Sequence, residues 1–140
     1  MDYETVSGDA FGRSLRGIGV NLLCRDVRGT AAFLHACFGL AVHRVSRDFA
    51  IVRHGDALFQ LHSDDAYSGH PLLDLVPENP PRGGAVQFYL FGIDPDDAVT
   101  RAKAAGGTII EEPADKPHGL REATILSPEG HAFSPAVNKA

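Results

Sequence analysis

Residues 85–107 read AVQFYLFGIDPDDAVTRAKAAGG, and this stretch predicts a strand that leads into a helix. Its opening run, AVQFYLFGI, is apolar and aromatic, which is typical of a buried strand. Asp94 then supplies an N-cap carboxylate, Pro95 suits the first helical position, and two further acids lie beside the positive helix end. The helix continues through AVTRAKAA and ends at Gly106.

The same order occurs nearer the N-terminus. The run IGVNLLC, residues 18–24, predicts a buried strand, and residues 30–38 place apolar side chains at helical spacing before Gly39. From Val20 to Gly39 the chain covers 19 positions, and the corresponding span of the second copy covers 20. The sequence is therefore a repeat in spacing, although few residues are identical.

Each predicted helix precedes three further predicted strands. They cover residues 41–47, 49–55 and 57–63 in the first copy, and 108–113, 120–127 and 131–137 in the second. We therefore expect an α+β protein in which two βαβββ modules form curved mixed sheets around a cleft. The expected organisation is an N-terminal arm (1–16) and a single domain (17–137), with module one at 17–64, a connecting segment at 65–84 and module two at 85–137. The arm is polar, Gly-rich and aperiodic, and we expect a tail or a segment that packs on a partner.

Composition narrows the classes of function. The chain has 140 residues with 44% hydrophobic and 22% charged residues, about one soluble domain. The net charge is -5, and the sequence contains no long run of residues with the same charge. We therefore expect no nucleic-acid partner. It has neither a secretory apolar region nor a run of 18 apolar residues, so we expect no membrane association and a cytoplasmic location. Cys24 and Cys37 form no CxxC pair and are expected to be reduced and mostly buried.

Two stretches resemble a known family. VNLLCRDVRGTAAFLHACFGLAV (20–42) and DPDDAVTRAKAAGGTIIEEPADKPHGLREATILSPEGHAF (94–133) are similar to the two halves of the glyoxalase, bleomycin-resistance and extradiol-dioxygenase superfamily, the vicinal oxygen chelate proteins. The resemblance covers residues 17–137. It implies the fold given above and a homodimer. Its members include lyases, dioxygenases, epimerases, thiol transferases and antibiotic-sequestering proteins, so the fold alone does not define the function.

The resemblance also implies four places for metal ligands. They correspond to Gly19, Gln60, Gln87 (or Ala85, if a loop is two residues longer) and Ser134. None carries a charge, whereas a catalytic divalent cation generally needs imidazole or carboxylate ligands. We therefore expect no cofactor, with a divalent metal as the alternative.

Several polar residues are candidates for a ligand site. Alternation along a strand puts His62 on the face of Gln60, and Tyr89 on the face of Gln87. We expect ligand contacts from Gln60, His62, Gln87, Tyr89 and Arg121. The alternatives are that His62 is a rim residue and that the glutamines point outward.

If the protein is an enzyme, the candidate catalytic residues are His118, Arg121 and His62. His118 could act as an acid or base, and Arg121 could hold a carboxylate or phosphate. Alternatively, Arg121 pairs at the surface with Glu111, Glu112 or Glu122.

Two functional hypotheses follow. The first is a metal-independent protein that binds a small molecule in an apolar cleft between the modules, as bleomycin-resistance proteins do. The second is a glyoxalase-like lyase or isomerase, or a dioxygenase, with an atypical metal or acid–base site.

Overall fold

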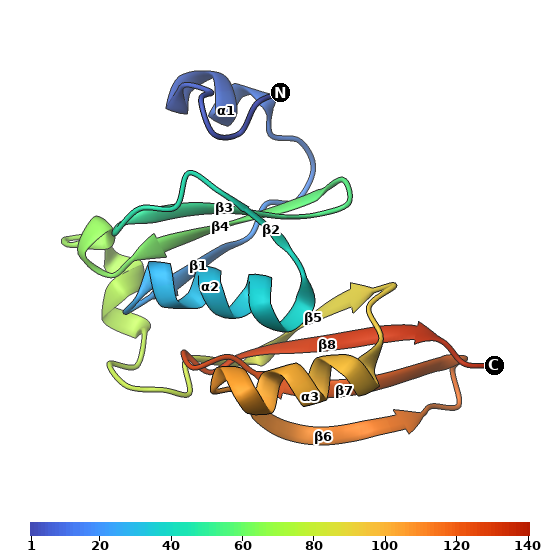
Figure 1. Cartoon of the computed structure of the whole chain (residues 1–140). Helices are drawn as coiled ribbons and strands as arrows, with labels where there is room; N and C mark the ends of the chain where they lie inside the picture. The colour runs from blue at the N-terminus through green and yellow to red at the C-terminus, as the bar shows by residue number, and fades with distance from the viewer. The chain divides into compact units, whose positions relative to one another are not determined.

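The computed structural model describes residues 1–140 and confirms an α+β fold with two four-stranded mixed sheets, one for each βαβββ module (Figure 1). The helices are α1 (Gly8–Ser14), α2 (Val27–Phe38) and α3 (Pro95–Ala105), and two short 3₁₀ helices are η1 (Asp65–Tyr67) and η2 (Pro71–Leu75). The strands are β1 (Asn21–Cys24), β2 (Ala41–His43), β3 (Phe49–His54), β4 (Ala57–Ser63), β5 (Gly83–Phe91), β6 (Thr108–Asp115), β7 (Leu120–Leu126) and β8 (His131–Asn138). The chain divides into two compact units, residues 1–31 with 40–74 and residues 32–39 with 75–140.

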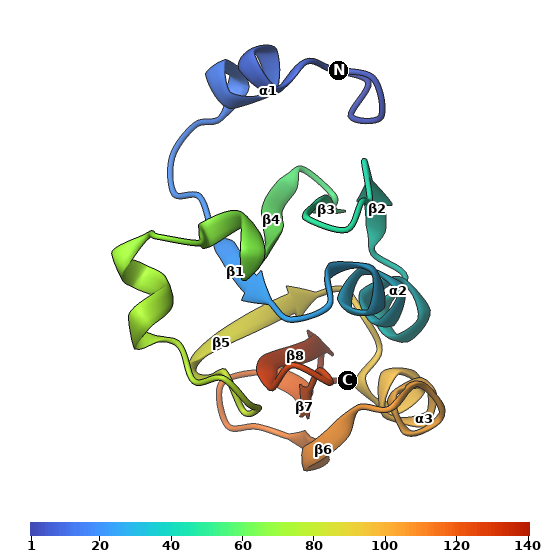
Figure 2. The same ribbon diagram turned by 90° about the vertical axis from the view of Figure 1, so that its left-hand side faces the viewer.

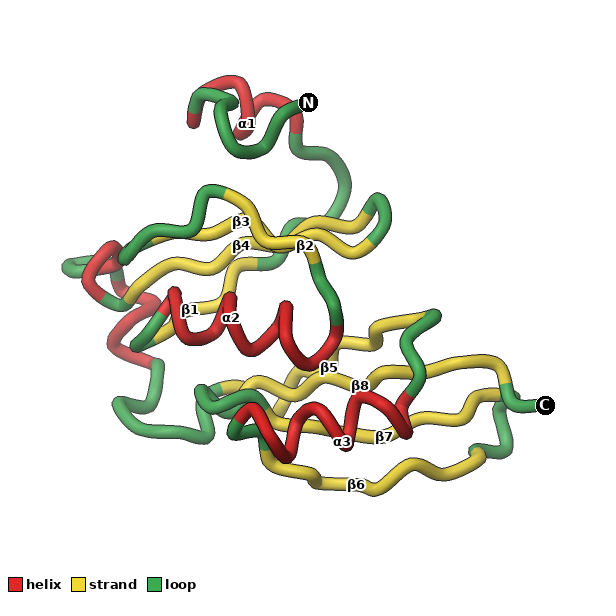
Figure 3. The backbone as a smooth tube through the Cα atoms, in the orientation of Figure 1, coloured by secondary structure: helices red, strands yellow, loops and turns green.

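The first unit contains a sheet with the strand order β1-β4-β3-β2, in which β1 and β4 are parallel and the other pairs are antiparallel. Register places Leu22, Ala50 and Leu61 on one face, where all three are buried. The opposite face carries Phe49 and His62, and α1 lies on that side (Figure 3). This sheet therefore has one apolar face and one mixed face beneath the arm.

The second unit repeats the pattern with the order β5-β8-β7-β6, and α3 packs along one face of the sheet (Figure 2). Ala98 and Ala102 of α3 are fully buried, as are Ile125 and Phe133 of the sheet. The Phe133 ring contacts that of Phe88, with ring centroids 5.3 Å apart. The other sheet face carries both polar side chains and the exposed rings of Tyr89 and Phe91.

Helix ends follow the predicted local signals. The Asp94 side chain accepts a hydrogen bond from the Asp96 amide at 2.9 Å, and Gly106 adopts a left-handed conformation with φ 89°. The α2 helix begins at Val27, three residues before the predicted 30–38 segment, because the Asp26 carboxylate accepts from the amide of Gly29 at 2.9 Å. Aspartate capping therefore extends the helix beyond its apolar stripe.

Three other predictions needed correction. The strand predicted at 41–47 ends at His43, because Arg44 adopts a left-handed backbone with φ 52°. The strand predicted at 18–24 begins only at Asn21. The arm, predicted to be aperiodic, contains α1, which is capped by Ser7 and anchored by the buried Phe11; one apolar anchor in one short helix produces no periodic stripe.

The segment between β4 and β5 contains the two 3₁₀ helices and loops (Figure 3). Cys24 and Cys37 are buried, as expected, and they form no disulfide. None of the helices has the length and apolar character required to span a bilayer.

Candidate functional site

The mixed face of the first sheet brings together three polar side chains. Asn21 is the register partner of Gln60 on the parallel strand β4, and His62 follows two residues later on the same face. The Nδ1 atom of His62 lies 2.6 Å from Oδ1 of Asn21, while Nδ2 of Asn21 donates to the hydroxyl of Tyr67 at 2.8 Å. His62 and Gln60 therefore share a face, as expected, and Asn21 lies beside them. Asn21 is not among the candidate residues expected from the sequence.

His62 lies in an aromatic surrounding. Its ring is 5.0 Å from the Phe49 ring and 5.5 Å from the Tyr67 ring, centroid to centroid. Desolvation by this half-buried position lowers the pKa of His62 below its ordinary value of 6.5. The imidazole is therefore neutral near pH 7. It donates Nδ1–H to Asn21, which leaves Nε2 as an acceptor.

The N-terminal arm covers part of this face. Phe11 contacts Phe49 edge-on at 6.4 Å, and Tyr3 contacts both Phe11 at 6.2 Å and His43 at 5.6 Å. The guanidinium of Arg53 lies 5.9 Å from the centre of the Tyr3 ring. The arm thus docks through aromatic and cation–π contacts on its own chain.

A cavity of about 730 Å³ lies between the arm and the hairpin of β3 and β4. It is lined by residues 14–20, by residues 56–60, and by Met1, Tyr3 and Phe11. Of the three polar residues Asn21, Gln60 and His62, it is Gln60 that lines this cavity. A cavity of this volume, with mixed apolar and polar walls, has the size of a small-molecule site.

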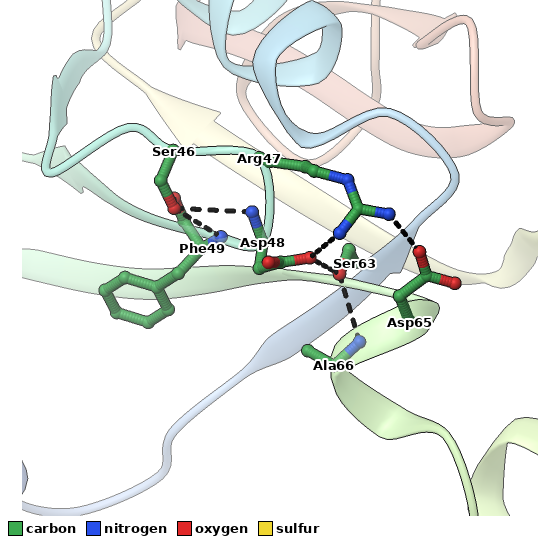
Figure 4. Close-up of polar contacts among 7 residues, drawn as sticks. All are labelled: Ser46, Arg47, Asp48, Phe49, Ser63, Asp65 and Ala66. Carbon is green, nitrogen blue, oxygen red and sulfur yellow. Dashed lines mark hydrogen bonds and ion pairs between the residues drawn. The ribbon is translucent and has the colours of Figure 1, made fainter.

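A hydrogen-bond network fixes the end of the same sheet (Figure 4). The Ser63 hydroxyl donates to the Asp48 carboxylate at 2.6 Å and accepts from the Ala66 amide at 3.1 Å. Arg47 bridges the carboxylates of Asp48 and Asp65. These contacts join the turn before β3 to the end of β4, and so they set the position of Phe49 beside His62.

In the second unit, Gln87 and Ser134 lie on the sheet face away from α3. Nε2 of Gln87 donates to Oγ of Ser134 at 2.8 Å, and Oγ of Ser134 lies 3.1 Å from Oγ1 of Thr124. Ser134 is fully buried. Both expected ligand-binding residues of this strand, Gln87 and Tyr89, lie on this face and are exposed.

The donor set implied by the family resemblance does not suit a divalent cation. Gly19 precedes β1 and offers no side chain, Gln60 and Gln87 are neutral amides, and the Ser134 hydroxyl is already bonded to two neighbours. No three His, Cys, Asp or Glu side chains lie close enough together to hold a metal ion. A cation would have too few charged or imidazole ligands to replace its water.

Arg121 is engaged by two carboxylates, and they are not those suggested by the sequence. Its Nε and Nη2 donate to both carboxylate oxygens of Asp96 at 2.8 and 2.9 Å, and Nη1 donates to Asp115 at 3.2 Å. These hydrogen bonds raise the pKa of Arg121 further above its ordinary value. The alternative pairing with Glu111, Glu112 or Glu122 is wrong, because Arg121 points toward α3. It links α3, β6 and β7.

Glu122 lies on the opposite face of β7 and is buried, with 4% of its surface exposed. Its Oε1 atom is 3.1 Å from Nε2 of His118. Desolvation, the charge of Glu122 and a hydrogen bond with Glu122 raise the pKa of Tyr89 on the neighbouring part of this face. From the sequence, Glu122 is expected only as a possible surface partner of Arg121. Alternation from Arg121 was the available signal that Glu122 faces the other way.

Comparison with known proteins agrees with this fold. Residues 19–134 match the model of the Glyoxalase/Bleomycin resistance protein/Dioxygenase superfamily. A family enzyme from Burkholderia phytofirmans PsJN is similar in structure, with a TM-score of 0.71 and 23% identity over 86% of this chain and 97% of that one. A glyoxalase-related enzyme from Fulvimarina pelagi has a TM-score of 0.70 and 18% identity over 88% of each chain.

TioX from Micromonospora sp. ML1 has a TM-score of 0.61 and 22% identity over 89% of this chain and 99% of that one. No curated protein matches the sequence. At these identities the solved structures support the fold alone, whereas the family model covers most of the chain. This protein belongs to the Glyoxalase/Bleomycin resistance protein/Dioxygenase superfamily.

Proposed function

We propose that this protein binds a small organic molecule, without a metal or other cofactor, in the cavity between its N-terminal arm and its first sheet. The observation that carries the proposal is the cavity of about 730 Å³ with the Gln60 side chain in its wall. The cleft expected from the sequence lies between the modules, whereas this cavity lies within the first unit.

The lining indicates the chemical class of the ligand. Phe11, Leu15 and Leu58 provide apolar surface, and the Gln60 amide can both donate and accept a hydrogen bond. Arg16 also lines the cavity, but its guanidinium donates to the carbonyl oxygens of Arg13 and Leu15. These features favour an amphipathic molecule with one or two hydrogen-bonding groups.

His62, on the same sheet face as Gln60, is a candidate for a further ligand contact. We also propose a cytoplasmic homodimer as the working form. Sedimentation velocity measures the oligomeric state directly. A monomer across the micromolar range would contradict the dimer without affecting the cavity.

The experiment is a fluorescence titration with the neutral apolar probe N-phenyl-1-naphthylamine. Gly19→Leu places a side chain in the cavity, since nothing lies within 4 Å of the position of a Cβ at Gly19. Gly12→Leu is the matched control, because Gly12 is also unobstructed but does not line the cavity. Thermal unfolding of each variant establishes that it is folded.

We expect saturable binding by the wild type, at least tenfold weaker binding by Gly19→Leu, and unchanged binding by Gly12→Leu. Gln60→Leu keeps the size of the side chain and should weaken binding of probes that carry an amide. The proposal is wrong if the wild type shows no saturable binding, or if both glycine variants bind equally well.

A further inference from the structure

We propose that the N-terminal arm is a lid on the cavity beside Gln60, and that a ligand enters and leaves when the arm detaches from Arg44 at its Glu4 end. This inference rests on the proposed function, because it concerns how the same cavity is filled. The match to the family model begins at residue 19, so the arm lies outside the matched domain.

The arm crosses the first sheet from one edge to the other. In the strand order β1-β4-β3-β2, the edges are β1 and β2. The chain leads from the arm into β1, Phe11 contacts Phe49 of β3, and Glu4 contacts Arg44 directly after β2. Figure 2 shows the chain running from α1 to β1, with the N-terminal segment on the side of β2. One end of the arm is therefore held covalently, and the other end only by noncovalent contacts.

The arm also forms much of the cavity wall. Met1, Tyr3 and Phe11 line the cavity together with residues 14–20, and the remaining lining residues are 56–60. Most of the second group belongs to β4, which is held in the sheet by its neighbours on both sides. Movement of the arm would therefore open the cavity without disturbing the wall that carries Gln60.

The contacts at the free end form a small latch, which consists of Glu4, Val6, His43 and Arg44. Oε1 of Glu4 accepts a hydrogen bond from the Arg44 amide at 3.1 Å and lies 3.4 Å from Nδ1 of His43. The Arg44 guanidinium donates to the carbonyl oxygen of Val6. Arg44 is the one non-glycine residue with a positive φ, and such strained residues are found at ligand clamps and switch segments. Both the amide and the side chain of this strained residue hold the arm.

The latch and the arm can open without unfolding the sheet. The Glu4 side chain is 58% exposed, and exposed charged contacts contribute little to stability. Within residues 1–16, Phe11 is the single buried side chain. The tether to β1, residues 17–19, takes part in no backbone–backbone hydrogen bond. Segments with so few buried contacts open at a low cost in free energy.

The test measures how fast N-phenyl-1-naphthylamine enters and leaves the cavity, by stopped-flow mixing and by dilution. Glu4→Ala removes both contacts of the carboxylate, and Glu4 does not line the cavity. We expect the association and dissociation rate constants to rise together by about fivefold, the effect of losing one exposed charged hydrogen bond. The Kd should stay unchanged, because a weaker latch destabilises the closed lid equally in the free and the bound protein.

Asp9→Ala is the matched control. It removes the same charge from the same arm, but Asp9 pairs with Arg13 inside α1, at 2.9 Å, and not with the sheet. Both rate constants should stay at their wild-type values. Arg44→Gly keeps the left-handed backbone and loses the guanidinium that holds Val6, so it should also raise both rate constants.

The lid and the proposed function fail in different ways. If the wild type shows no saturable binding of the probe, the proposed function is wrong, and the lid is wrong with it. If the wild type binds the probe and Glu4→Ala keeps both wild-type rate constants, the lid is wrong and the cavity remains the binding site. A rise in the dissociation rate constant alone would also overturn the lid, because it would show that Glu4 stabilises only the complex.

Hydrogen exchange supplies a readout that needs no ligand. The amides of α1 should exchange faster in Glu4→Ala than in the wild type, because the arm leaves the sheet more often. Faster entry and exit of the probe without faster exchange in α1 would contradict a moving arm.

Discussion

The imidazole of His62 is oriented by the carboxamide of Asn21, whose Oδ1 atom lies 2.6 Å from Nδ1 of the ring. Nδ2 of the same amide donates to the Tyr67 hydroxyl, so both ends of the carboxamide are engaged. In this orientation of the amide, Oδ1 accepts a hydrogen bond and Nδ1 of His62 carries the proton.

Asn21→Ala should destabilise the protein by about 1–2 kcal/mol, because Nδ1–H of His62 then lacks its acceptor in a half-buried site. Urea unfolding measures the change, and the nitrogen chemical shifts of His62 should show a loss of the Nδ1–H tautomer. Asn138→Ala, at the exposed end of β8, is the control. A wild-type tautomer in Asn21→Ala would contradict the assigned orientation.

Stability should fall as the pH decreases from about 7 to 5. Desolvation lowers the pKa of His62 and of His131 below the ordinary value of 6.5. The unfolded chain then binds more protons than the folded chain below about pH 6.5, so acid favours unfolding. His62→Gln should make the decline shallower in thermal melts, and an unchanged slope would contradict the prediction.

Phe11→Ala should release the arm while the sheets stay folded. Phe11 is 5% exposed. Its ring contacts Phe49 in the first sheet and Tyr3 within the arm. We expect trypsin to cleave at Arg13 and Arg16 at least several times faster, because a docked helix protects its backbone. Phe91→Ala removes an exposed ring of the second unit and should not alter this cleavage.

Ser63→Ala should cost about 1–2 kcal/mol of folding free energy. The substitution removes a donor to Asp48 and an acceptor for the Ala66 amide, both shown in Figure 4. Urea unfolding of Ser63→Ala and of the exposed control Ser68→Ala should differ by that amount. Equal stability of the two variants would mean that water replaces both hydrogen bonds.

Cys37 should resist alkylation by iodoacetamide at pH 8. Desolvation raises the pKa of its thiol to about 12, and its Sγ lies 3.4 Å from the carbonyl oxygen of Ala98. Since the thiolate is the reactive form, a Cys24→Ala protein should react slowly when folded and rapidly in urea. Rapid reaction of the folded protein would show that Cys37 is reached by solvent.

The repeated module could be predicted from sequence because its signals are local. Asp94, Pro95 and Gly106 determine the ends of α3 through contacts with their own neighbours. Period-two alternation likewise predicted that Gln60 and His62 share a face. The beginning of α2 and the end of β2 were missed, because the Asp26 cap and the left-handed Arg44 are features of single residues without a repeating pattern.

The amino-acid sequence by itself determined the two βαβββ modules and the neutral residues at the four places where the family resemblance implies metal ligands. Tertiary structure alone decided that Arg121 reaches Asp96, that Glu122 is buried beside His118, and that the arm docks on the first sheet. In a strand with alternating charges, the local sequence does not distinguish a buried glutamate from an exposed one. They differ only in the side chains that distant strands and loops bring against them, and that packing sets both their burial and their partners.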